Sequence, residues 1–112
     1  MAEYLLVLTT VSEEAVASRI ARQLVEERLA ACVTVSSPCQ SFYWWEGDIS
    51  EEREWMLFIK TKGSLYPELE KRLQEIHPYS VPEVLAFSVA VGAEKYLRWL
   101  DQETSPAGKE NL

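Results

Sequence analysis

The segment from His77 to Glu83 holds the residues of this chain that are best able to do chemistry. Its sequence, HPYSVPE, contains the single histidine, a tyrosine and a carboxylate, with two prolines that stiffen the backbone between them. His77 could bind a metal ion, could act as a general acid or base with Glu83, or could satisfy the last carbonyls of a helix ending beside it. Its place at a predicted helix end favours the structural role, and no nucleophile is spaced to pair with it.

Two further places could hold a ligand. Lys60, Thr61 and Lys62 end a predicted strand, where ammonium and backbone N–H groups could bind an anion, although an ordinary solvated strand end is the favoured explanation. Cys32 could be a soft ligand for Cu(I), but its apolar surroundings favour a buried core thiol, and we expect both it and Cys39 to be free. One histidine and two cysteines cannot close a tetrahedral zinc site without a carboxylate.

Motifs of the common enzyme classes are missing from the sequence. There is no HExxH, no glycine-rich phosphate loop, no Gly-x-Ser-x-Gly and no CxxC. The residues therefore predict no enzyme.

Size and charge restrict the partners. A chain of 112 residues with 47% hydrophobic content can bury the core of one α/β domain. Eighteen acidic against eleven basic residues give a net charge of −7, which repels nucleic-acid phosphates and anionic lipid, so neither nucleic acid nor membrane is an expected partner. The apolar runs are too short to span a bilayer and the first residues lack a basic leader, which predicts a cytoplasmic protein.

Hydrophobic periodicity predicts four strands and three helices. Ser12 and Ser64 are the expected caps of the first two helices, and a turn at Glu46-Gly47-Asp48 is expected to close a hairpin. The predicted elements, in chain order, are a strand at 4–10, a helix at 12–29, a long bent strand at 31–36 and 41–45, a strand at 54–62, a helix at 64–77, a strand at 84–91 and a helix at 93–100.

The order β-α-β-β-α-β followed by a helix is that of the α+β, ferredoxin-like sandwich. Residues 1–101 form a single domain in this interpretation, and the polar stretch 102–112 is expected to be a disordered tail. The fold by itself serves many functions and decides none of them.

The hairpin carries an unusual run of aromatic residues, Phe42-Tyr43-Trp44-Trp45. Because strand side chains alternate, large rings must lie on both of its faces, and the helices of this fold cover only one side of the sheet. The other side would expose an aromatic patch, so we expect a partner subunit to cover it. Alternatively, the last helix with Trp99 covers the patch within one chain. The rings could also stack on bases or sugars, but the charge and the missing RNA-recognition pattern disfavour bases.

Several stretches, in order, resemble the CutA family of divalent-cation tolerance proteins, from Tyr4 to about Leu100. They are RLAAC at 28–32, YWWEGDI at 43–49, the strand at 54–61, HPYxxPE at 77–83 and YLxW at 96–99. The resemblance implies a tightly packed ferredoxin-like homotrimer whose hairpins complete neighbouring sheets. It also implies a link to tolerance of copper and other divalent cations.

The resemblance further implies where ligands would bind. In some members copper is attributed to a cysteine ending the first strand and to two histidines opening the His-Pro-Tyr motif; here these positions are Thr9, Ile76 and His77. Thr9 and Ile76 cannot replace a thiolate and an imidazole, so copper or another divalent cation would bind weakly, elsewhere or not at all. The family's shared residues suggest a cleft between subunits, with Tyr43, Trp45, Lys60 and Tyr79 for a ligand and His77 with Glu83 for a metal ion.

These observations predict a non-enzymatic homotrimer that acts in the response to divalent metal cations and in signalling, and that holds a small ligand or cation in its inter-subunit clefts. Two alternatives remain open. One is a small enzyme that uses His77 and Glu83 as acid and base at the subunit interface. The other is a chaperone-like module that offers its aromatic surface to another protein.

Overall fold

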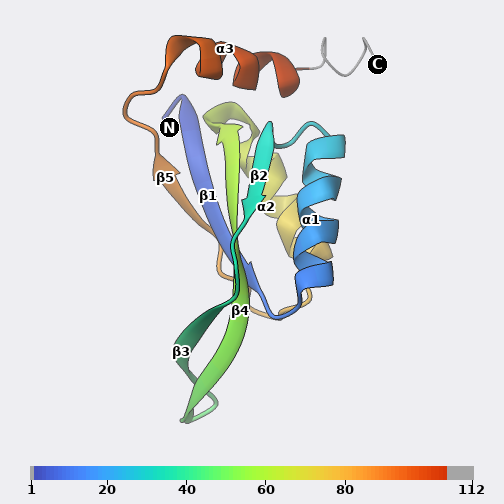
Figure 1. Cartoon of the computed structure of the whole chain (residues 1–112), viewed down its shortest axis with the longest axis vertical. Coiled ribbons are helices and arrows are strands. Elements are labelled where there is room, and N and C mark those ends of the chain that lie inside the picture. Colours follow the sequence, from blue (N-terminus) through green and yellow to red (C-terminus); the bar gives the residue numbers. More distant parts are fainter. Residues whose placement is uncertain (1, 106–112) are drawn as a thin grey trace.

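The sheet of this protein is built around β1 (Tyr4–Val11), which lies between β4 (Asp48–Lys62) and β5 (Leu85–Ser88) in the computed structural model (Figure 1). β2 (Cys32–Val35) and β3 (Cys39–Trp45) both pair with β4, and every pairing is antiparallel. The structure describes residues 2–105. The sheet order β2-β4-β1-β5 is the ferredoxin-like order, so the predicted fold is confirmed.

Two helices, α1 (Glu14–Glu26) and α2 (Tyr66–Ile76), cover one face of this sheet (Figure 1). Alternate strand residues turn toward them, as the strand period requires. The core consists of fully buried side chains from both layers, among them Val7, Leu57, Ile59, Ile20, Leu24, Leu69 and Leu73.

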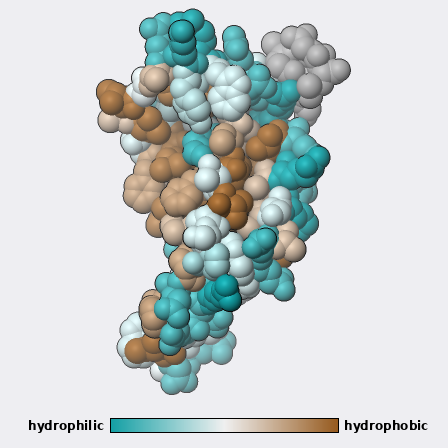
Figure 2. All heavy atoms as spheres, in the orientation of Figure 1, coloured by the Kyte–Doolittle hydropathy of each residue, from teal (hydrophilic) through white to brown (hydrophobic). Residues whose placement is uncertain are grey.

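The opposite face of the sheet has no covering layer within the described residues. Leu6 lies opposite Phe87 and Leu8 opposite Leu85, so these side chains share one face with Phe58. Leu85 and Phe87 are 51% and 50% exposed. Apolar side chains gather at the middle of this face, which Figure 2 views directly. We call Leu6, Leu8, Phe58, Leu85 and Phe87 the open sheet face.

The hairpin formed by β3 and the first half of β4 extends beyond the body of the molecule (Figure 1). Its turn has positive φ at both Glu46 (49°) and Gly47 (87°), which matches the twist of the flanking strands, and the predicted turn is confirmed. α3 (Glu94–Glu103) crosses the opposite end of the sheet, where Trp99 stays partly exposed. The alternative in which Trp99 covers the hairpin aromatics is therefore wrong.

The ends of the first two helices differ from the prediction because side-chain capping is not used. α1 begins after Glu13, and neither Ser12 nor Ser64 caps a helix; a short 3-10 turn, η1 (Gly63–Leu65), leads into α2 instead. α1 ends at Glu26 because Arg28 has a left-handed φ of 62°, and its guanidinium reaches Glu103 of α3 at 2.6 Å.

The end of the chain also differs from the prediction. β5 stops at Ser88, which pairs with Leu5 of β1. The next residue, Val89, still donates a hydrogen bond to the Tyr4 carbonyl, but β1 begins at Tyr4, so the residues after Val89 have no partner in that strand. α3 continues past Leu100 to Glu103, and the buried Thr104 donates to the Leu100 carbonyl at 2.8 Å. Residues 106–112 of the expected tail lie outside the described residues.

Candidate ligand pocket

A partly open cavity of about 700 Å³ lies between the hairpin, the end of β1 and the loop that joins α2 to β5. Its walls combine aromatic rings, hydroxyl groups and carboxylates. The lining residues are Thr10, Ser12, Ser41, Phe42, Tyr43, Trp45, Ser50, Glu52, Glu54, Tyr79, Ser80, Val81 and Glu83. We refer to this cavity as the hairpin pocket.

Strand register decides which hairpin side chains line the pocket. Tyr43 lies opposite Ser50, and Ser41 opposite Glu52, so these residues share one face with Trp45 and Glu54, which we call the pocket face.

The other face of the hairpin, the outer face, carries Phe42, Trp44, Ile49 and Glu51. Phe42, Trp44 and Ile49 are 63%, 72% and 64% exposed, and of the four outer-face residues only Phe42 also reaches the pocket. The aromatic run is thus divided between a pocket wall and a surface that faces away from it.

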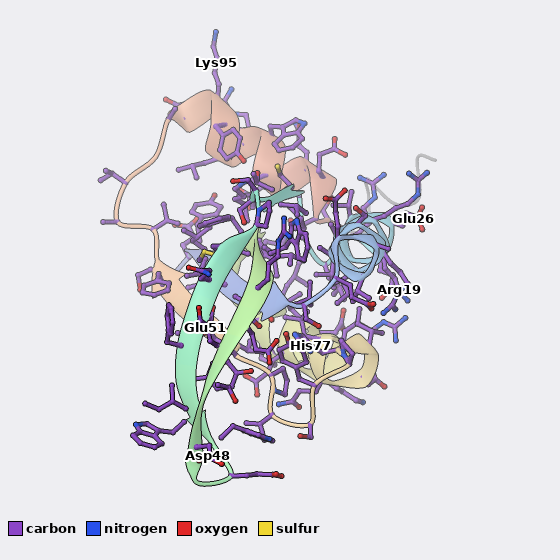
Figure 3. The ribbon with its side chains drawn as sticks, turned by 60° about the horizontal axis from the view of Figure 1, so that its bottom comes forward. Arg19, Glu26, Asp48, Glu51, His77 and Lys95 are labelled. Carbon is purple, nitrogen blue, oxygen red and sulfur yellow. The ribbon has the colours of Figure 1, made fainter. Side chains whose placement is uncertain are left out.

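His77 anchors the loop to the body of the molecule. Its Nε2 lies 2.9 Å from the carbonyl oxygen of Thr10, and its Nδ1 accepts a hydrogen bond from the backbone N–H of Tyr79 at 3.1 Å. These partners assign the neutral tautomer with its proton on Nε2. Burial lowers the pKa of His77, against the opposing effects of the Thr10 carbonyl and Glu54. Figure 3 shows His77 in the body beside α2, away from Asp48 at the hairpin tip.

Tyr79 connects the same loop to the hairpin. Its phenol donates a hydrogen bond of 2.6 Å to Oε2 of Glu54, which is only 4% exposed. The ring also makes an edge contact with His77, with centroids 4.8 Å apart. Burial and the bond to Glu54 raise the pKa of Tyr79, so the phenol keeps its proton at neutral pH. The loop is therefore bonded to β1 through His77 and to β4 through Tyr79.

Carboxylates dominate the charge of the pocket. Glu52, Glu54 and Glu83 line it, and no lysine or arginine is among its described lining residues. Burial raises the pKa of Tyr43, and Glu52 and Glu54 raise it further, because a phenolate would be repelled by both. The pocket is thus a site for cationic or neutral groups.

The structure gathers four of the six predicted site residues. Tyr43, Trp45, Tyr79 and Glu83 line the pocket. Lys60 does not, because its ammonium is hydrogen-bonded to Thr34 and lies 3.7 Å from the Cys32 sulfur on β2.

His77 does not line the pocket either, because it is buried behind the loop that it holds. Glu54 and Glu52 were not predicted. Counting residues outward from the two-residue turn would have placed Glu52 on the same face as Tyr43.

The donor atoms do not fit the copper centre that the resemblance suggested. Thr9 is fully buried and its hydroxyl has no partner in the described structure, while both ring nitrogens of His77 are already hydrogen-bonded. Cys39 donates to the Glu54 carbonyl at 3.3 Å. Among residues 2–105, no three His, Cys, Asp or Glu side chains are grouped so that they could hold a metal ion.

Comparison with known proteins gives the family. The family model described as CutA1 divalent ion tolerance protein matches residues 5–103. The chain belongs to the CutA1 family. The divalent-cation tolerance protein CutA of Thermus thermophilus is 46% identical over 98 residues, which cover 88% of this chain and 95% of that protein. The crystal structure of CutA from Xylella fastidiosa has a TM-score of 0.90 at 38% identity and covers 93% and 100% of the two chains.

CutA1 relatives differ among themselves in length and in compartment. The chloroplastic CutA 1 protein of rice is 39% identical over 100 residues, which cover 89% of this chain but 56% of that protein. Within residues 2–105, no helix has the length and apolar character needed to cross a membrane. The family is named for tolerance of divalent ions and not for a reaction.

Proposed function

We propose that this CutA1 protein is a cytoplasmic, non-enzymatic homotrimer that acts in the response to divalent cations, copper included, and that binds a small ligand in clefts between its subunits. The observation that carries the proposal is the pair of uncovered apolar surfaces on one chain, the outer face of the hairpin and the open sheet face.

Self-association would cover both surfaces. Large exposed apolar patches on soluble chains mark interaction sites, and β3 pairs with β4 alone in the described structure, so its other edge can accept a strand. The two surfaces lie on different parts of the chain. Contact of one surface with the other on the next subunit is heterologous, and such contacts form a ring when the rotation between subunits closes and a filament when it does not. A trimer is the small ring of this kind that the family resemblance favours.

The geometry of His77 supports a binding protein over an enzyme. An acid–base pair of His77 and Glu83 would need a free ring nitrogen at the pocket, and both nitrogens of His77 are bonded inside the protein. A cation would instead meet the pocket carboxylates or groups brought together by assembly, which predicts weak binding. Calorimetric titration with Cu(II), Cu(I) and Zn(II) should give weak heats, and added Zn(II) should leave the NMR signals of the His77 imidazole unshifted, because both ring nitrogens are bonded inside the protein. Imidazole signals that shift with the metal would restore the histidine site.

Light scattering at micromolar concentration tests the assembly. We expect a mass three times the 12.8 kDa of the chain, and a lower mass for Trp44→Ala on the outer face. Val91→Ala is the matched control, because Val91 is exposed and apolar but lies outside both surfaces. A wild-type mass of one chain would refute the trimer.

A growth assay tests the role in cation tolerance. Cells that lack this protein should regain growth on copper when they carry the wild type or Val91→Ala, and should not regain it with Trp44→Ala. Equal growth with all three would separate tolerance from assembly and would contradict the proposal.

A further inference from the structure

We propose that the hairpin pocket binds a small organic cation, with an ammonium group among its carboxylates and an apolar skeleton against Tyr43 and Trp45. This inference rests on the proposed function, because it names the class of the small ligand proposed there and places it in a pocket that one chain lines, at the hairpin that the neighbouring subunit would meet. It also assigns separate tasks to the two faces of one hairpin: the pocket face holds the ligand, and the outer face holds the neighbouring subunit.

The aromatic wall supports the apolar half of this ligand. Tyr43 and Trp45 are 39% and 45% exposed, so part of each ring is open to the cavity that they line. Tyr79 stands across from them on the loop and is held in place by its bond to Glu54. Rings with free faces attract cations through their negative quadrupole and also bury alkyl groups.

The carboxylates support the charged half. Glu52 and Glu54 approach from β4 and Glu83 from the loop, so negative charge reaches the cavity from two sides. Glu54 is almost fully buried, which weakens the screening of its charge by solvent. No basic residue is among the described lining residues, so apart from the hydrogen bond that Tyr79 donates to Glu54, no group in the wall offsets this charge before a ligand arrives.

Other ligand classes fit less well. An anion would meet three carboxylates without a basic partner. A bare metal ion is far smaller than a cavity of about 700 Å³, and the described residues contain no cluster of three metal-binding side chains. A neutral sugar could stack on the rings but would leave the charge uncompensated. An organic ammonium ion can place its apolar part against the aromatic rings and its charge beside the carboxylates.

Three probes that share one skeleton test the charge requirement. Cyclohexylammonium, cyclohexanol and cyclohexanecarboxylate are titrated into the full chain at one fixed salt concentration, with binding followed by NMR shifts. We expect cyclohexylammonium to bind at least about tenfold more tightly than cyclohexanol, and the carboxylate not to bind. Equal binding of the ammonium and the alcohol, or no binding of the ammonium, would overturn the inference.

Two variants with a matched control test the location. Glu52→Gln removes one pocket charge at constant shape, and Glu51→Gln makes the same change on the outer face, one residue away. Figure 3 shows Glu51 part-way along the hairpin. We expect Glu52→Gln and Trp45→Leu to weaken cyclohexylammonium binding about five- to tenfold, and Glu51→Gln to leave it within about twofold. Equal losses in both glutamine variants would indicate non-specific attraction and refute the site.

Light scattering on the same samples separates the two proposals. A trimer that does not discriminate between the probes overturns the organic-cation inference and leaves the assembly intact. A monomer that binds cyclohexylammonium selectively supports the ligand class and refutes the trimer.

Discussion

The hydrogen bond from Tyr79 to Glu54 should be the main polar link between the loop and the hairpin, and Tyr79→Phe removes it at nearly constant shape. The bond is 2.6 Å long and its acceptor is a carboxylate that is 4% exposed. A hydrogen bond to a charged group contributes about 1.5–3 kcal/mol. Tyr79 is itself partly exposed, so we expect Tyr79→Phe to lower the free energy of unfolding by an amount at the lower end of this range, about 1.5–2 kcal/mol.

Urea unfolding followed by circular dichroism measures this loss, at one protein concentration for all variants because assembly contributes to stability. With a slope of about 1.5 kcal/mol per molar urea, the midpoint should fall by about 1 M. Tyr43→Phe is the matched control: it removes a hydroxyl from the same pocket, and the Tyr43 phenol has no hydrogen bond to another described residue. Midpoints that agree for the two variants would refute the argument.

The pH dependence gives the same bond a second test. Because the pKa of Tyr79 is raised above its usual value of 10.0, the folded phenol stays protonated where the unfolded one ionises. The unfolded state then binds fewer protons, so the stabilisation is complete below pH 10 and declines as the pH rises above it. The gap between wild type and Tyr79→Phe should therefore narrow between pH 8 and pH 11. A gap that widens would contradict the assigned donor.

Three further predictions concern single features of the fold. The single histidine gives one titrating imidazole signal by NMR, and its midpoint should lie below 6.5 because burial lowers the pKa of His77. The free energy of unfolding should therefore fall as the pH drops through 6.5, and a midpoint above 6.5 would argue against the buried neutral ring. Gly47→Ala should lower the free energy of unfolding by about 1 kcal/mol, because Gly47 has a φ of 87° that alanine adopts only with strain. An added Cβ meets no atom within 4 Å, so no steric clash contributes, and an unchanged urea midpoint would show that the turn relaxes. Arg72→Lys should lower the free energy of unfolding by about 0.5–1 kcal/mol, because it breaks the paired 2.9 Å hydrogen bonds to Glu27. The difference from wild type should shrink in about 1 M salt, and a difference that salt leaves unchanged would indicate lost packing instead.

The sequence predicted the turn of the hairpin because its determinants are local, but β4 begins at Asp48, six residues before the predicted strand at 54–62. The Glu46-Gly47 turn, flanked by residues whose side chains alternate between the two faces of the hairpin, requires only short-range geometry, and the structure confirms it. The same alternation places rings on both faces of the hairpin. Which face lines a pocket depends on the loop after α2, which is distant along the chain, so periodicity alone could not decide it.

The candidate site shows the same division between local and distant contacts. The segment at 77–83 could be recognised from its residue types, but His77 proved to be a buried anchor because its Nε2 meets the Thr10 carbonyl, a contact 67 residues apart. Lys60 was grouped with the pocket residues, yet the β2–β4 pairing places it beside Cys32. Glu54, the most buried carboxylate of the pocket, carried no sequence signal of its own.

Local patterns in the sequence therefore determined the order of strands and helices, the face of each that enters the core, and the family. Only the tertiary structure decided which side chains line the pocket, that both nitrogens of His77 are hydrogen-bonded, and which apolar surfaces one chain leaves uncovered. The physical reason is distance along the chain: hydrophobic periodicity and turn conformation involve neighbouring residues, whereas the pocket is made where β1, the hairpin and the loop after α2 meet.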